Sequence, residues 1–142
     1  MRSQSARPGP GSHRLLFAVG GLALVLVGMS GCGPTDPLQL STIQVGRSLN
    51  PDSSIAEHTT AFRKSDTVYV AVLTTAPGRG TIRVRWTYGG QLIDEPQREV
   101  SYREPAATSF QLVNSGGFPP GNYNVEVFID DESVGSRNFR VE

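Results

Sequence analysis

A period-two alternation of apolar and polar residues is the feature that most constrains the fold of this chain. In segment 81–88 (TIRVRWTY) every second residue is apolar, and the residues between them are Arg or Thr. Successive side chains of a β-strand point to opposite faces. The segment therefore predicts a half-buried strand, with Trp86 on the buried face and Arg83 and Arg85 on the wet face.

The rest of the chain after residue 40 extends this pattern. Gly89–Gly90 predicts a two-residue hairpin turn. The sequence indicates tight turns at 78–80 and 130–133, and no stretch here combines helical periodicity with caps. Further strands are predicted at 67–74, 98–102, 108–113, 123–130 and 136–141. Seven or eight short strands predict an all-β, antiparallel sandwich. Another β-sandwich type or a small barrel remains the alternative.

The first 31 residues differ from the rest. Residues 1–14 are polar and basic, and residues 15–29 (LLFAVGGLALVLVGM) contain no charge. As a helix this apolar run would span about 22 Å, short of the ~30 Å hydrocarbon core. A basic segment followed by an apolar run of this length predicts a secretory signal peptide. A short membrane anchor and a core helix are the alternatives.

Cys32 is the single cysteine of the chain and follows this apolar run. The motif MSGC, Met29–Cys32, resembles the lipobox of bacterial lipoproteins, although Met29 stands where leucine is commoner. The resemblance implies cleavage after Ser30 and Gly31, a diacylglyceryl group on the Cys32 thiol, and acylation of the new amine by a chain such as palmitate. A chance cysteine in an ordinary signal peptide is the alternative.

A lipidated Cys32 implies a membrane-anchored protein of the bacterial cell envelope, since two or more acyl chains anchor stably. Residues 32–40 (CGPTDPLQL) then predict an extended tether, which gives a signal peptide at 1–31, a tether at 32–40 and a domain at 41–142. Gly33 stands where Asp favours inner-membrane retention in enterobacterial lipoproteins. The outer membrane is therefore expected rather than the inner one.

Two residues give the predicted sandwich an immunoglobulin-like character. Trp86 lies in mid-strand, and Tyr123 follows a loop at a strand start. These positions resemble the core tryptophan and the tyrosine corner of immunoglobulin-like domains. The resemblance places Val70 and Val125 near the positions of the antibody disulfide, so apolar packing is expected to replace that bridge.

The mature region shows no pattern typical of catalysis, and neither a cofactor nor a metal is predicted. His58 is its only histidine and is expected in a surface loop. The acidic runs 94–95 and 130–132 are interpreted as solvated turn residues rather than a calcium site. On the wet face, Glu126 is expected to pair with Arg83 or Arg85 across neighbouring strands.

The segment GGFPPG is the best candidate for a binding loop, with Phe118, Pro119 and Pro120 at its tip. A rigid apolar tip loses little entropy on binding. The alternative, which we prefer, is that Phe118 caps one end of the core.

Charge excludes one class of partner. Residues 32–142 hold ten basic and thirteen acidic residues, so no basic footprint for nucleic acid exists. The sequence predicts a non-enzymatic envelope lipoprotein that binds or spaces other envelope proteins or polysaccharide. An accessory subunit of a secretion or assembly complex that uses strand addition is the alternative. A carbohydrate-binding module is less favoured.

Overall fold

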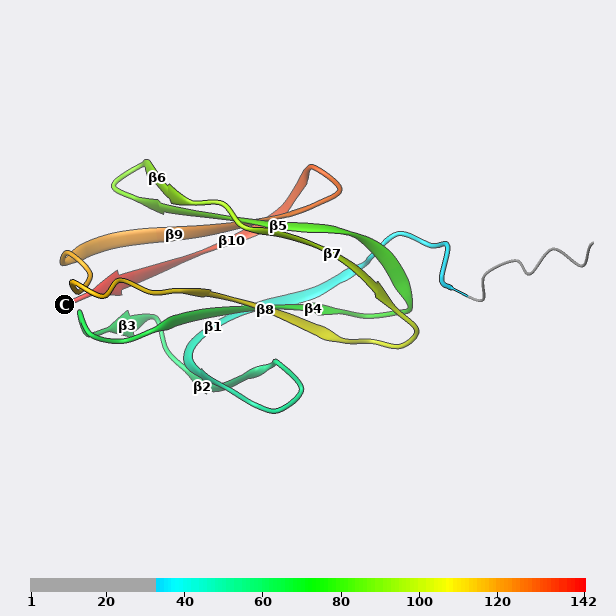
Figure 1. Cartoon of the computed structure of the whole chain (residues 1–142), viewed down its shortest axis with the longest axis horizontal. Coiled ribbons are helices and arrows are strands. Elements are labelled where there is room, and N and C mark those ends of the chain that lie inside the picture. The colour runs from blue at the N-terminus through cyan, green and yellow to red at the C-terminus, as the bar shows by residue number, and fades with distance from the viewer. Residues whose placement is uncertain (1–32) are drawn as a thin grey trace, which may run out of the picture. The chain divides into compact units, whose positions relative to one another are not determined.

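The computed structural model describes residues 33–142, which form ten β-strands and no helix. The strands pack as two sheets, seen edge-on in Figure 1. Their bounds are β1 Leu40–Leu49, β2 Ile55–His58, β3 Ala61–Phe62, β4 Val68–Thr74, β5 Gly78–Tyr88, β6 Gln91–Asp94, β7 Gln97–Tyr102, β8 Ala107–Leu112, β9 Gly121–Ile129 and β10 Glu132–Val141. The all-β prediction is confirmed.

The strand order defines a sandwich with one open side. One sheet has the order β2-β1-β4-β8, and the other has the order β3-β10-β9-β5-β6, with β7 also pairing with β5. All pairs are antiparallel except β3 with β10. Strands β6 and β7 share the edge of β5 that faces away from β9, so β6, β7 and β8 border the same side of the sandwich. Ten strands are present rather than seven or eight: the predicted strands do not include β1, and β2 and β3 are too short to show a clear alternation.

The core lies between the sheets and follows the predicted alternation. Trp86, Val70 and Val125 are fully buried, so the positions expected to replace a disulfide are indeed apolar core. The Trp86 ring meets the Phe139 ring edge-to-face, with centroids 6.0 Å apart. The indole Nε1–H of Trp86 has no hydrogen-bond partner among the described residues. Packing, rather than polar contacts, therefore holds the tryptophan in place.

Tyr123 forms the predicted tyrosine corner. Its hydroxyl donates a hydrogen bond to the carbonyl oxygen of Pro119 at 2.6 Å, four residues upstream. Its ring stacks on Phe139 at 5.2 Å and meets Phe118 edge-to-face at 6.0 Å. Burial raises the pKa of the Tyr123 phenol above its usual value of 10.0. The corner ties the loop before β9 to the end of the core.

The segment around His58 corrects the sequence analysis. His58 ends strand β2 instead of lying in a loop, although its side chain is exposed as expected. Strand β2 is held on β1 where β1 bends at Gly46, and a Cβ atom at Gly46 would lie 2.1 Å from the carbonyl oxygen of Glu57. Ile55 at the start of β2 is buried outside the main core. The register shifts beside Gly46 and Ser48 hide this short strand from a period-two search.

The predicted tether also ends earlier than expected. Leu38 is buried in the core, and Pro37 forms a parallel bridge with Arg79. Residues 36–40 therefore belong to the domain instead of to a tether that runs to residue 40. The supposed turn at 78–80 is wrong too, because Gly78–Gly80 opens strand β5. Gly78 and Gly80 add no apolar alternation, so the predicted strand at 81–88 leaves out the first three residues of β5.

The tyrosine corner generates the first prediction. Tyr123→Phe removes the hydroxyl and keeps the ring, so we expect a loss of about 1 kcal/mol in the free energy of unfolding. Urea denaturation measures it. The matched control is Tyr88→Phe, whose hydroxyl donates to the carbonyl of Pro120 at 2.9 Å in an exposed position. Equal losses in the two variants would show that the corner has no special role.

Candidate binding site

An apolar cleft opens at the side of the sandwich where the two sheets end at β6 and β8. It has a volume of about 260 Å³. Ile93 of β6 forms one wall, Leu112 and Val113 at the end of β8 form the other, and Phe118 and Pro119 lie at its end. Tyr88 and Tyr123 line the remainder. The cleft is thus an interruption in the contact between the two sheets.

Ile93 and Val113 line the cleft and are exposed, and Leu92 lies next to Ile93 on β6. The large apolar side chains that are exposed within residues 33–142 are Leu92 (59%), Ile93 (45%) and Val113 (59%). All four residues of β6 are exposed, and β6 is an edge strand of its sheet. Edge strands are commonly protected by charges, prolines or a covering segment. Apart from Asp94 at its end, the short strand β6 has no charge, proline or covering segment from residues 33–142, and two adjacent apolar residues lie at its centre.

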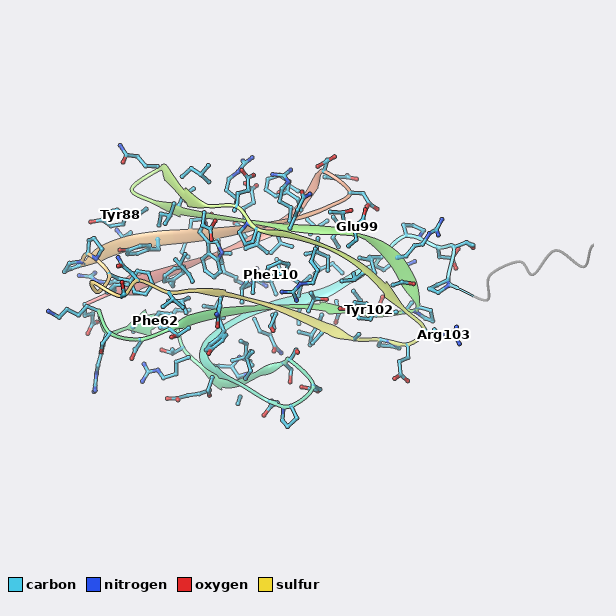
Figure 2. All side chains as sticks on the ribbon, viewed as in Figure 1. Phe62, Tyr88, Glu99, Tyr102, Arg103 and Phe110 are labelled. Carbon is cyan, nitrogen blue, oxygen red and sulfur yellow. The ribbon has the colours of Figure 1, made fainter. Side chains whose placement is uncertain are left out.

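Where β7 faces β8, the same side of the sandwich is closed. The Arg98 guanidinium of β7 lies over the Phe110 ring at 4.9 Å and donates to the carbonyl of Ser109 at 3.2 Å. The hydroxyls of Tyr102 and Thr108 are hydrogen-bonded at 2.6 Å. Figure 2 shows Phe110 and Tyr102 between the sheets along this side. Side chains of β7 therefore bridge to β8, whereas β6 makes no such bridge and leaves the cleft open.

The predicted binding loop contributes to the cleft, but not as an exposed phenylalanine. Phe118 is 4% exposed, and its backbone N–H donates to the carbonyl of Lys64 at 2.9 Å. The preferred interpretation, that Phe118 caps the core, is confirmed. Pro119 and Pro120 are exposed, and Pro119 reaches the cleft. Of the three residues, the prolines are the ones available to a partner.

The cleft itself is not predicted from the sequence. Leu92 and Ile93 are adjacent, so a strand cannot place both of them in one core. That conflict was a signal available in segment 91–94 (QLID). The part played by Val113 had no comparable signal, because it depends on how the two sheets end relative to each other.

A second group of side chains lies on the wet face of the six-stranded sheet. Arg85 Nη1 lies 3.6 Å from Glu126 Oε1, so the predicted cross-strand pair is confirmed for Arg85. Glu95 contacts both arginines, and its carboxylate is 3.1 Å from Arg85 Nε. The Arg83 and Arg85 guanidinium groups lie 4.0 and 4.8 Å from the Phe128 ring centroid. The arginines therefore cover an apolar ring and do not form a free cationic patch.

Glu95 departs from the expectation of a solvated turn residue. The hydrogen bond from Arg83 lowers the pKa of the Glu95 carboxyl below its usual 4.5, and Arg85 lowers it further. Its side chain is only 28% exposed. Glu95 lies between β6 and β7, so it fixes the bend of the edge as the chain passes from one strand to the other. Its role is structural.

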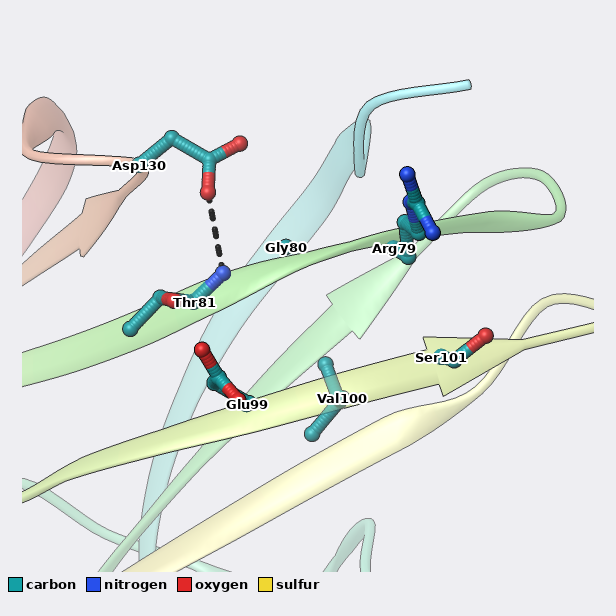
Figure 3. Close-up of a pocket in the computed structure, with 7 residues that line it drawn as sticks. All are labelled: Arg79, Gly80, Thr81, Glu99, Val100, Ser101 and Asp130. Atoms are coloured by element: carbon teal, nitrogen blue, oxygen red, sulfur yellow. Dashed lines mark hydrogen bonds between the residues drawn. The ribbon is translucent and has the colours of Figure 1, made fainter. Parts of the chain in front are cut away.

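A hollow with both polar and apolar lining lies over β5, β7 and the β9–β10 turn. It measures about 540 Å³, and Asp130 lines it together with Glu99 and Ser101 (Figure 3). The Asp130 carboxylate accepts the backbone N–H of Thr81 at 2.9 Å. A Cβ atom at Gly80 would lie 2.9 Å from this carboxylate. The acid at the turn is therefore engaged with the strand backbone.

Other predicted sites divide between described and undescribed residues. Cys32, Ser30 and Gly31 lie outside the described range, so lipidation and cleavage stay predictions. Within residues 33–142, no group of three or more His, Cys, Asp or Glu side chains could hold a metal ion. The same range contains no helix long and apolar enough to cross a membrane.

The Glu95 cluster generates the second prediction. Because the folded-state pKa of Glu95 is below its unfolded value, its contribution to stability is present above about pH 4.5 and is lost as the pH falls through the folded pKa. The stability difference between wild type and Glu95→Gln should therefore shrink from pH 6 towards pH 3 in urea titrations. Glu104→Gln, in an exposed loop, is the control and should show a smaller change. A difference that stays constant with pH would contradict this role.

The comparisons with known proteins concern the fold. No family model matches the chain, and no curated protein matches it in sequence. An immunoglobulin-like protein from Pseudomonas aeruginosa is similar in structure, with a TM-score of 0.53 and 12% identity over 78% of this chain and 100% of the other. The DNA glycosylase AlkC of Pseudomonas fluorescens, which was solved bound to DNA, matches with a TM-score of 0.50 and 11% identity over 75% of this chain and 31% of the glycosylase.

At these identities the similarity extends to the fold alone. Together with the strand order, the buried Trp86 and the corner at Tyr123, it identifies the domain as an immunoglobulin-like β-sandwich.

Proposed function

We propose that this protein is a non-enzymatic binding module of the bacterial cell envelope, anchored by a lipid on Cys32. The observation that carries the binding role is the unprotected edge strand β6 beside an apolar cleft. Leu92, Ile93 and Val113 expose apolar surface there, whereas β7 closes the rest of the same side. A partner would bury this surface.

The form of the site favours an extended segment of another envelope protein. A free edge strand offers backbone donors and acceptors to an added strand, and the side chains of that strand supply specificity. A volume of about 260 Å³ is small beside the roughly 300–1,000 Å³ of sites for drug-sized ligands. An apolar side chain from an added strand fits between Ile93 and Val113. This observation favours strand addition, the mode expected of an accessory subunit in an envelope complex.

Burial of the aromatic residues argues against a carbohydrate-binding surface. Sugar sites present aromatic faces to solvent, but every aromatic side chain of residues 33–142 is buried or half-buried. Trp86 is fully buried. Polysaccharide is therefore less favoured than protein as the partner.

The envelope location is supported by the sequence. The basic start, the apolar run at 15–29 and the motif at Met29–Cys32 form the signal of a lipoprotein. The outer membrane is favoured because Gly33 follows the cysteine. Cys32 is the single cysteine of the chain, so it is the only thiol that could carry the lipid.

The third prediction tests the binding role. A photo-crosslinking amino acid at Leu92 should give a discrete crosslinked product in cells. Adding Ile93→Lys should abolish that product and change the unfolding free energy by less than about 0.5 kcal/mol, because the side chain is exposed. The control is Ser101→Lys, an exposed change on β7 of the same edge. Crosslinking that survives Ile93→Lys, or is lost equally with Ser101→Lys, would contradict the cleft as the site.

The fourth prediction tests the anchor. Wild-type protein expressed in a bacterial host should partition into detergent and begin at an acylated Cys32 by mass spectrometry. Cys32→Ala should be neither acylated nor processed at that bond. A wild-type protein without the lipid mass would remove the envelope part of the proposal and leave the cleft unaffected.

A further inference from the structure

We infer that the end of the sandwich where the chain enters lies against lipid headgroups, and that the cleft is held away from the membrane. This inference rests on the proposed lipidation of Cys32. The entry end comprises Asp36–Pro37 and the loops 75–77 and 103–106. The far end comprises the Gly89–Gly90 turn and loop 113–120. The first and last residues of β5 lie at these two ends (Figure 1).

The chain is fixed to the domain at a defined residue. The carbonyl oxygen of Asp36 accepts the backbone N–H of Arg79 at 2.9 Å, and Pro37 forms a parallel bridge with Arg79. Leu38 then enters the core with 6% exposure. A Cβ atom at Gly78 would lie 2.7 Å from the Pro37 carbonyl oxygen, so this close approach requires glycine. The docked part of the chain therefore begins at Asp36.

The β9–β10 turn leaves the backbone of Arg79 on β5 unpaired by β9. The Asp130 backbone N–H donates to the Thr81 carbonyl, and the Asp130 carboxylate accepts the Thr81 N–H, both at 2.9 Å. Pairing between β5 and β9 starts only at Ile82. The backbone of Arg79 is then available to Asp36. The attachment is thus part of the sheet and not a flexible contact.

Only three residues, 33–35, separate Asp36 from Cys32. A fully extended chain spans at most about 3.6 Å per residue, so the Cα atoms of Cys32 and Asp36 can be no more than about 14 Å apart. Strand β5 has 11 residues and is about 33 Å long. The tether is therefore less than half the length of the domain, and a lipid on Cys32 holds the entry end at the headgroups.

Charge does not determine this orientation. The entry end carries Arg79 and Arg103 together with Asp36 and Glu104, and further acids lie beside it at Asp52, Glu99 and Asp130. Figure 2 shows Arg103 at this end, away from Tyr88. Because this end has no excess of positive charge, the short tether positions the domain, and the contact should persist at high salt. The cleft, which Tyr88 lines at the far end, then faces the aqueous compartment.

The fifth prediction measures this orientation on the full lipidated protein in vesicles of phosphatidylethanolamine and phosphatidylglycerol. Lipidation consumes the only native thiol, so Thr75→Cys, Ser136→Cys and Ser115→Cys each carry one fluorophore. These exposed positions mark the entry end, the outer face of β10 and the far end. A quencher on the lipid headgroups should quench Thr75→Cys most and Ser115→Cys least, at both low and high salt.

The matched control lengthens the tether with twenty Gly and Ser residues between Gly33 and Pro34. Such a linker has a root-mean-square length of about 25 Å, so the three positions should then be quenched weakly and alike. Strong quenching of Ser136→Cys would show that the domain lies on its sheet and would overturn the inference. An order unchanged by the longer tether would also overturn it. If the protein lacks the lipid mass and does not float with the vesicles, the proposed lipidation of Cys32 is wrong. This outcome is distinct from a wrong orientation of an anchored domain.

Discussion

The hydrogen bond and ring contacts of Tyr123 are the interaction on which the far end of the domain depends. The side chain stacks on Phe139, which in turn meets Trp86, so one residue connects the loop before β9 to the centre of the core. Phe118 packs against the same ring. Because the loop is held in place in this way, Pro119 borders an open cleft instead of covering it.

Two stretches of the same edge of this sandwich, β7 and β6, differ in how they are covered. Along β7, the side chains of Arg98 and Tyr102 bridge to β8 and close the gap between the sheets. In β6, which precedes Glu95 in the chain, Leu92 and Ile93 provide neither charge nor cover. An unprotected edge beside a hydrophobic cleft risks aggregation in a free domain. A binding partner that covers the edge strand and the cleft would remove this risk of aggregation. That is the physical basis of the proposed function.

Much of the fold could be predicted from local pattern, and the elements that could not share one property. The strands at 81–88 and 123–130 alternate cleanly because one of their faces is buried and the other is wet. Strand β2 is short and pairs with β1 in an irregular register, and the start of β5 contains two glycines, so neither has an alternation to detect. The pair of Arg85 with Glu126 was predictable because the two residues lie on neighbouring strands. Glu95 reaches Arg83 and Arg85 from the segment between β6 and β7, where no alternation of residues predicts its position.

The sequence by itself determined the sandwich class, the core tryptophan, the tyrosine corner and the motif at Cys32, because each depends on side chains a few residues apart. The cleft, the docking of Asp36 on Arg79 and the short reach of residues 33–35 were decided only by tertiary structure. They arise where segments far apart in the chain meet at sheet edges. Contacts at a sheet edge depend on where each strand ends. A strand ends where its neighbouring strands stop pairing with it, and the alternation of residues within one segment does not determine that point.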